Sequence, residues 1–264
     1  MTSQAVRYTP QPAHGGLSRT RDAEFWFDDG NIVLLARGVE FRIYKGILAE
    51  FSPVFHDMFS FPQPTPTVTT SKSAFAAATD PCPIVDLPDS PEDLRHILRV
   101  CMPKSGSSLF KLKSPSYHMI SAIIRLGHKY QMDDLVNDAV DYLKRWYTFI
   151  LEEWAEGRLY APDAPFEPEK AHAIGVVNLA RLVDEPLLLP SALLMCCSLN
   201  CADIVKGFTR EDGTREMLSL DDIGRCFAAR TKFSEYVLLF LVARTSEPLV
   251  ATDCAAPAEC QEAL

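Results

Sequence analysis

The sequence lacks the local motifs that mark the common enzyme classes. Its 264 residues contain no Gly-x-Ser-x-Gly elbow, no Gly-x-Gly-x-x-Gly turn and no Walker phosphate loop. The adjacent carboxylates Asp28 and Asp29 stand beside Gly30, and these residue types favour a solvated turn over a pair of catalytic acids. We therefore expect a protein that is not an enzyme and that uses no cofactor.

Cysteine and positive charge are also scarce. Eight cysteines are too few for a disulfide scaffold, and none of them form a Cys-x-x-Cys pair. Cys196, Cys197 and Cys201 leave open a metal site, although free cysteine is more often buried in a core. Because 35 acidic residues outnumber 26 basic ones, the net charge of −9 argues against direct nucleic-acid binding and against an electrostatic membrane anchor.

Long hydrophobic runs are absent as well. The longest strongly apolar stretch, from Tyr236 to Ala243, is far shorter than the roughly twenty residues that span a bilayer. The first twenty residues contain no apolar run of the kind that forms a secretory signal. We therefore expect an intracellular protein, cytoplasmic or nuclear, that does not enter a membrane.

The first half of the chain mixes strand and helix patterns. An apolar run from Ile32 to Ala36 and an alternating segment from Val39 to Tyr44 predict a β-hairpin. Ser52-Pro53 and Ser90-Pro91 each pair an N-cap residue with proline at the first helical position, so a helix is expected after each. Apolar residues at helical spacing between 117 and 146 predict further helices, and the fold class is α+β.

The second half is predicted to be helical, after a Pro- and Glu-rich linker from Ala155 to Pro168. The expected helices cover Ala171–Glu185, Ser191–Val205, Asp221–Ala229 and Ser234–Arg244. The predicted organisation is a flexible arm (1–21), an α+β domain (22–146) with a mobile insertion (62–83), a helical region (147–244) and a flexible tail (245–264).

One run of spaced residues resembles a known family. Between residues 41 and 59 the order is Phe41-x-x-Tyr44-Lys45-x-x-Leu48-Ala49-x-x-Ser52-x-x-Phe55-x-x-Met58-Phe59, which is similar to the central motif of BTB/POZ domains. Ile84–Leu87 with its following helix, and Ala122 to Leu143, resemble later parts of that fold. The sequence from Asp29 to Leu34 is similar to the corresponding sequence of many fungal members, which often carry a helical C-terminal region.

The resemblance implies a small β-sheet flanked by helices that acts as a protein–protein interaction module. It implies self-association, with a homodimer possible, and recruitment of a protein partner. Two alternatives stay open: a substrate adaptor for a cullin ubiquitin ligase, and a transcription co-regulator that acts through a partner. Cullin-binding members often carry a hydrophobic-x-Glu motif soon after the Met-Phe pair, and here no glutamate occurs between Glu50 and Glu92.

Six residues are candidates for a protein interface. Phe25, Trp26 and Phe27 are consecutive, so both faces of that segment are apolar, and one of them needs the C-terminal half, a second copy or a partner to cover it. The resemblance adds Asn31, Tyr44 and Lys45, which stand where the family commonly has Asp, His and Lys. The candidates are Phe25, Trp26, Phe27, Asn31, Tyr44 and Lys45. Phe55, Met58 and Phe59 are instead expected in the core, because of their helical spacing.

Overall fold

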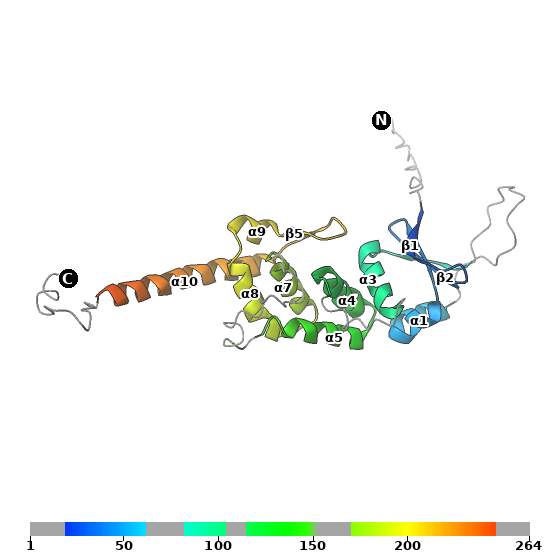
Figure 1. Cartoon of the computed structure of the whole chain (residues 1–264), viewed down its shortest axis with the longest axis horizontal. Coiled ribbons are helices and arrows are strands. Elements are labelled where there is room, and N and C mark those ends of the chain that lie inside the picture. Colours follow the sequence, from blue (N-terminus) through cyan, green and yellow to red (C-terminus); the bar gives the residue numbers. More distant parts are fainter. Residues whose placement is uncertain (1–18, 62–81, 104–114, 149, 151–169, 247–264) are drawn as a thin grey trace, which may run out of the picture. The chain divides into compact units, whose positions relative to one another are not determined.

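The computed structural model describes residues 19–61, 82–103, 115–148, 150 and 170–246 (Figure 1). Most of the predicted arm, insertion and tail, and the whole predicted linker from Ala155 to Pro168, lie outside the described residues. The chain divides into two compact units. Unit 1 combines residues up to 112 with 126–136, and unit 2 combines 113–125 with the residues from 137 onward.

A four-stranded sheet forms the centre of unit 1. Its strands are β1 (Thr20–Trp26), β2 (Ile32–Ala36), β3 (Val39–Ile43) and β4 (Ile84–Leu87), in the spatial order β1-β3-β2-β4. Strands β2 and β3 form the predicted antiparallel hairpin, with Ile32 opposite Ile43. Arg37 and Gly38 both have positive φ angles, of 45° and 88°, which is typical of the tightest hairpin turns.

Strand β1 was not predicted as part of the sheet. It pairs in parallel with β3, and its register shifts between Arg21 and Trp26, so the middle of the strand leaves the regular ladder. Strand β4 pairs in parallel with β2 at the other edge. The two outer strands of the sheet therefore come from segments on either side of the hairpin in the sequence.

Three described helices lie wholly within unit 1, and the two that follow Ser52 and Ser90 begin where the sequence predicted. The three helices are α1 (Lys45–Phe51), α2 (Pro53–Ser60) and α3 (Pro91–Cys101). The backbone N–H of Phe55 donates to the Ser52 hydroxyl at 3.0 Å, and that of Asp93 donates to the Ser90 hydroxyl at 3.0 Å. Both predicted caps are confirmed, and Phe55 is buried as expected.

Ser52 also joins two distant parts of unit 1. Its hydroxyl donates to the backbone carbonyl of Tyr130 at 2.5 Å, while the Tyr130 ring stacks on Phe55 with centroids 4.3 Å apart. The Tyr130 hydroxyl donates to Asp89, and Lys129 forms an ion pair with the same carboxylate at 2.6 Å. Burial and the contact with Asp89 raise the pKa of Tyr130.

Helices α4 (Tyr117–Lys129) and α5 (Asp133–Lys144) supply residues to both units. The other elements of unit 2 are α7 (His172–Leu182), the 3-10 helix η3 (Pro186–Leu188), α8 (Leu189–Cys197), α9 (Cys201–Lys206), β5 (Phe208–Thr209), β6 (Arg215–Glu216) and α10 (Leu220–Ser246). None of the helices among these described residues combines the length and the apolar character needed to cross a bilayer.

Two helix predictions for this part of the chain were wrong. The segment Ser191–Val205 is divided between α8 and α9, because the Asn200 side chain accepts from the N–H of Asp203 at 2.9 Å and begins a new helix. The two helices expected around residues 221–244 are one continuous helix, α10, since no glycine or proline interrupts residues 229–234. Residues 210–214 join the short strands β5 and β6.

The interior of unit 2 combines aromatic stacking with buried charge. The Tyr117 ring stacks on His172 with centroids 4.3 Å apart, and a Cβ added at Gly175 would lie 1.6 Å from the Tyr117 hydroxyl oxygen. The buried Glu216 carboxylate pairs with Arg125 and accepts from the Asn178 side chain at 3.0 Å. Burial lowers the pKa of His172 to about 4, so this ring is neutral at neutral pH.

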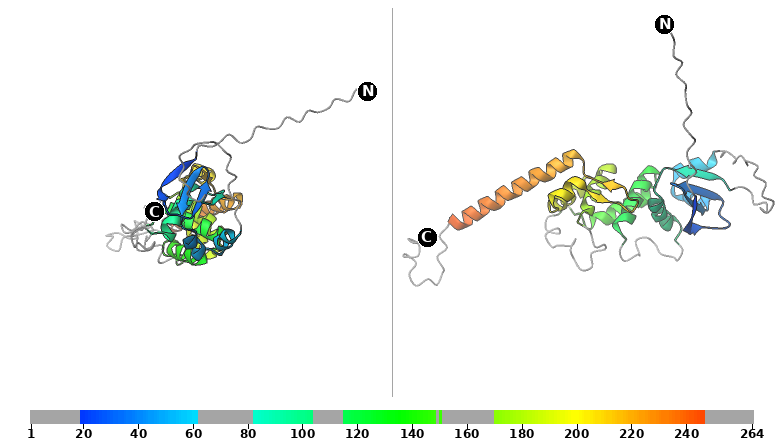
Figure 2. Two further views of the ribbon diagram at one scale, coloured as in Figure 1. Left: turned by 90° about the vertical axis from the view of Figure 1, so that its right-hand side faces the viewer. Right: turned by 90° about the horizontal axis from the view of Figure 1, so that it is seen from above.

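Helix α10 differs along its length. Its N-terminal part packs against α8, and Cys226 there is buried. From residue 231 to 244 every position is exposed, although the sequence between 236 and 243 is entirely apolar. Figures 1 and 2 show this part of α10 running on beyond α8. We call residues 231–244 the α10 extension.

Candidate protein-interaction surface

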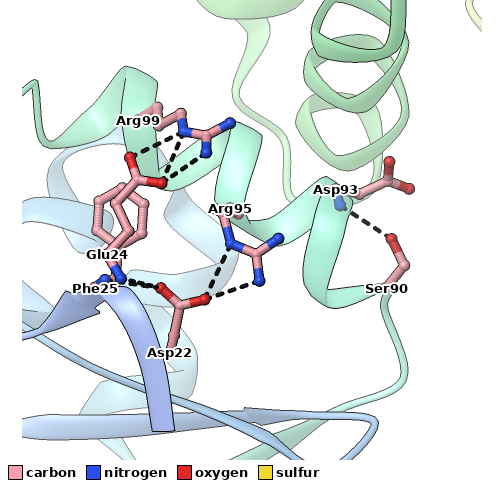
Figure 3. Close-up of polar contacts among 7 residues, drawn as sticks. All are labelled: Asp22, Glu24, Phe25, Ser90, Asp93, Arg95 and Arg99. Carbon is pink, nitrogen blue, oxygen red and sulfur yellow. Dashed lines mark hydrogen bonds and ion pairs between the residues drawn. The ribbon is translucent and has the colours of Figure 1, made fainter. Parts of the chain in front are cut away.

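Strand β1 is attached to helix α3 by two ion pairs (Figure 3). Arg95 donates to the Asp22 carboxylate through two nitrogens, at 3.0 and 2.8 Å, and Arg99 contacts both Glu24 oxygens at 2.6–3.0 Å. Residues two apart in a strand are separated by about 6.7 Å, and residues four apart in a helix by about 6 Å. The spacing of the acids on β1 therefore matches the spacing of the arginines on α3.

Asp22 also organises the irregular part of β1. Its Oδ1 accepts from the backbone N–H groups of Glu24 and Phe25, at 2.9 and 2.8 Å, which satisfies two donors that the shifted register leaves out of the ladder. Burial alone would raise the pKa of the Asp22 carboxyl, but these hydrogen bonds together with Arg95 hold the pKa below its ordinary value. Asp22 is thus ionised and fixed.

The same local geometry decides the position of Phe25. Its side chain is completely enclosed, with 0% of its surface exposed, so it is a core residue. Its prediction as an interface residue was wrong, because the turn made by Asp22 directs the Phe25 side chain into the interior. Trp26 and Phe27, which follow it, are only half-buried. The Arg21 guanidinium lies over the Trp26 ring, 4.4 Å from its centroid.

The structure brings four of the other candidates together at one end of the hairpin. The Phe27 and Tyr44 rings lie 5.1 Å apart in a tilted arrangement. The Tyr44 hydroxyl donates to Asp29 at 2.5 Å, and this contact raises the pKa of Tyr44. The Asn31 side-chain oxygen accepts from the backbone N–H of Lys45 at 2.8 Å.

This hydrogen bond explains what Asn31 does. The residue before α1, Tyr44, makes no side-chain cap of its own, so Asn31 supplies the missing acceptor from the start of β2. Asn31 and Lys45 are both exposed, and Tyr44 is half-buried. We call Trp26, Phe27, Asn31, Tyr44 and Lys45 the turn surface. Whether it binds a protein stays a prediction.

A groove of about 540 Å³ lies elsewhere on unit 1. Residues of α1, α2 and the start of α5 line it, and they include Glu50, Asp133 and Asp134 together with the partly exposed ring of Phe51. Its carboxylates give this groove a negative rim. No residue predicted for the interface lies in it.

The residues considered for metal binding are separated by their burial. Cys196 is buried, Cys197 is half-buried and Cys201 is exposed, and burial raises the pKa of the Cys196 thiol. Across the described ranges, no three His, Cys, Asp or Glu side chains are placed to hold a metal ion. Asp28 and Asp29 are exposed, and the backbone N–H of Gly30 donates to the Phe27 carbonyl, as expected of a turn.

Two features of the structure were missed at the level of the sequence. One is the pairing of β1 with α3, for which the alternate acids at 22 and 24 and the arginines at 95 and 99 were the available signal. The other is the exposure of the α10 extension, where the sequence predicted a helix over Ser234–Arg244. Its eight consecutive apolar residues, from Tyr236 to Ala243, were the available signal for a helix that needs covering on more than one side.

In the described residues of unit 1, a small mixed sheet is accompanied by helices that begin at serine caps. Residues 18–146 match the family model described as the BTB/POZ domain. The chain therefore contains a BTB/POZ domain, the fold class is α+β, and this domain is a protein-interaction module. No curated protein sequence matches the chain significantly.

Proposed function

We propose that the BTB/POZ domain binds a second copy of the chain and recruits a protein partner through the turn surface. The observation that carries this proposal is the half-buried pair of Phe27 and Tyr44, which stands beside the exposed Lys45 and continues from Trp26. Aromatic side chains that combine a large apolar surface with a polar end are the residues that most often dominate interface energies.

The attachment of β1 supports this proposal. Two ion pairs and the hydrogen bonds of Asp22 hold the strand before Trp26, so little conformational freedom is lost there on binding. In the described sheet β1 is an edge strand with one paired side. Its other side offers backbone groups to an incoming segment.

The two alternatives are less well supported. A cullin adaptor would bind through the surface after Met58, where Phe61 is exposed, but the chain has no glutamate between Glu50 and Glu92. A transcription co-regulator would act through the partner that the turn surface recruits. Both stay predictions.

Light scattering on a size-exclusion column tests the proposal with Trp26→Glu. We expect the wild-type chain at tens of micromolar to have a mass above 29.4 kDa, and the variant to have a lower mass with unchanged circular dichroism. A charge at Trp26 opposes burial of the turn surface. Ile84→Glu is the matched control, because Ile84 is an exposed apolar residue on β4 at the opposite edge of the same sheet.

Three results would contradict the proposal. A wild-type mass of 29.4 kDa removes the homodimer. An equal loss of mass in Ile84→Glu means that the turn surface is not specific. Loss of the native circular dichroism in Trp26→Glu makes Trp26 a residue of the core.

A further inference from the structure

The α10 extension presents apolar surface on a rigid element. Its side chains at Phe233, Tyr236 and Phe240 are 47%, 69% and 63% exposed. An exposed patch of this kind on a folded chain usually marks a binding site. The BTB/POZ domain match ends at residue 146, so the extension lies outside it.

The base of α10 is fixed, so the extension is already in a helical conformation before anything binds. The N–H of Asp222 donates to the Ser219 hydroxyl at 3.1 Å, and Arg181 and Arg225 pair with the Asp222 carboxylate at 2.9 and 2.7 Å. Arg230 donates to the carbonyl of Leu199 at 3.2 Å. A preformed helix lowers the entropy that ordering would cost on association.

One side of the helix carries a stripe with the spacing of a helix–helix contact. Successive members are four, three, four and three residues apart, so they follow one line along the helix. The members of this α10 stripe are Ala229, Phe233, Tyr236, Phe240 and Ala243. Val237 and Leu239 flank the stripe, whereas Leu238 lies on the opposite side of the helix.

The order of large and small side chains along the stripe is complementary to the same order read in the opposite direction. In an antiparallel pair centred on Leu238, Tyr236 of one helix faces Phe240 of the other, and Phe233 faces Ala243, so each large ring meets a ring or a small residue that leaves room for it. A parallel pair would place Phe on Phe and Ala on Ala. The centre at 238 is also close to the middle of residues 231–244, so the two exposed segments overlap almost completely.

The area and the charge of the stripe are compatible with such a contact. Each aromatic ring has roughly 200 Å² and each flanking aliphatic side chain about 100 Å², of which 47–69% is exposed, so two copies would bury at most about 1,000 Å², the lower limit for a specific interface. Between Phe233 and Ala243 the only ionised residue is Glu235, which lies off the stripe and pairs with Lys232 at 2.8 Å. The stripe itself therefore carries no charge. Lys232 and Arg244 flank its two ends and lie opposite each other in this register, so their like charges meet at the solvent-exposed rim of the pair, where Glu235 offsets Lys232.

We infer that a second copy of this chain covers the α10 stripe, in an antiparallel helix pair that places Tyr236 of each copy against Phe240 of the other. This contact is isologous, so each copy supplies the same residues and the pair is closed. It uses a surface separate in sequence from the turn surface and does not depend on the function proposed above.

Photocrosslinking of the full-length chain tests this inference. With p-benzoylphenylalanine at position 240, irradiation is expected to give a covalent species of twice the 29.4 kDa chain, joined to the peptide that contains Tyr236 of the second copy. The same amino acid at position 238 is the matched control, because Leu238 is as exposed as Phe240, at 63%, but points away from the stripe. It should give little of this species.

A second measurement uses charge in place of the crosslinker. In sedimentation velocity, Phe240→Glu is expected to weaken self-association at least tenfold, while Leu238→Glu leaves it unchanged. Both positions are exposed in α10, so circular dichroism should stay native. Four results would each overturn the inference. They are equal effects of the two variants, a crosslink within one chain, a crosslink to another part of the second copy, and no crosslink at all.

The Trp26→Glu variant separates this inference from the proposed function. It should leave the crosslink at position 240 in place, because Trp26 belongs to β1 in unit 1 and the stripe belongs to unit 2. Loss of mass in Trp26→Glu with the crosslink preserved supports both contacts. If Trp26→Glu keeps both its mass and the crosslink, the substitution is combined with Phe240→Glu: a double variant that associates as strongly as Phe240→Glu alone removes the contact at the turn surface and leaves the α10 pair.

Discussion

Strand β1 and the α10 extension both carry aromatic side chains, yet the structure treats them in opposite ways. Phe25 in β1 is completely enclosed, whereas Tyr236 in α10 is 69% exposed. Strand β1 is tied to α3 by two long-range ion pairs, and the extension carries one local ion pair, between Lys232 and Glu235. The contacts made by neighbouring polar groups, more than the aromatic content, decide whether a ring enters a core.

The buried carboxylates that hold the two regions have different effects on the side chains that follow them. In β1 the buried Asp22 directs Phe25 inward and leaves Trp26 and Phe27 half-buried. In α10 the contacts of Asp222 fix the base, and the helix then continues through the exposed residues 231–244. Strand β1 presents a small part of its apolar surface, whereas the large apolar side chains of the α10 extension are 47–69% exposed.

The largest effect is expected when one aromatic ring is removed from each region. Phe25→Ala should lower the free energy of unfolding by about 3–5 kcal/mol, because it empties a filled site in the core. Phe240→Ala should change it by less than about 0.5 kcal/mol at high dilution, where association does not contribute. Urea unfolding followed by circular dichroism measures both. Similar losses in the two variants would show that α10 is covered within its own chain.

A smaller effect on the free energy of unfolding is expected when the buried charge that holds β1 against α3 is removed. Asp22→Asn keeps the size of the side chain but removes the charge that Arg95 contacts, at a cost of about 2 kcal/mol. The pKa of Asp22 is lowered in the folded chain, so the advantage of the wild type is full above the ordinary value of 3.8. This stability advantage is lost as the pH falls through the lowered pKa that Asp22 has in the folded chain. Unfolding curves of both proteins across this pH range measure the difference, and an advantage that grows in acid would contradict this account.

The smallest effect is expected at the second ion pair of β1. Glu24 and Arg99 are partly exposed, so Glu24→Gln should cost less than about 1 kcal/mol. Added salt should shrink this difference further, because solvent ions screen exposed charges. Thermal unfolding at low and high salt provides the measurement. A loss as large as that of Asp22→Asn would mean that the two pairs are not ranked by burial.

The parts of the fold that depend on neighbouring residues were predictable. The hairpin follows from the alternation around Arg37-Gly38, and the helices follow from the N-caps at Ser52 and Ser90. Each of these signals lies within a few residues of the structure it specifies. The family resemblance rested on the same segment, and the domain match confirms it.

The parts that depend on distant residues were not predictable in this way. The parallel pairing of β1 with β3 has no local turn to mark it, and the inward direction of Phe25 depends on Asp22 and on Arg95, which is 73 residues further along. The division of Ser191–Val205 and the continuity of α10 were also missed, because a cap such as Asn200 and the absence of a breaker are weaker signals than proline.

Of the six candidate interface residues, five keep some accessible surface, and Phe25 does not. The sequence could place Asn31 and Tyr44 in the motif, but it could not show that Asn31 completes the start of α1 or that Tyr44 contacts Asp29. The role of a side chain in a turn depends on where the following helix begins.

The hydrogen bond between Ser52 and Tyr130 has a consequence for the order of events during synthesis. The two residues are 78 positions apart, so the hydroxyl that begins α2 finds its second partner only after residue 130 has left the ribosome. The hairpin and the cap on Phe55 can form earlier from local contacts. Unit 1 therefore becomes complete only after residues 126–136, which belong to it, have been synthesised.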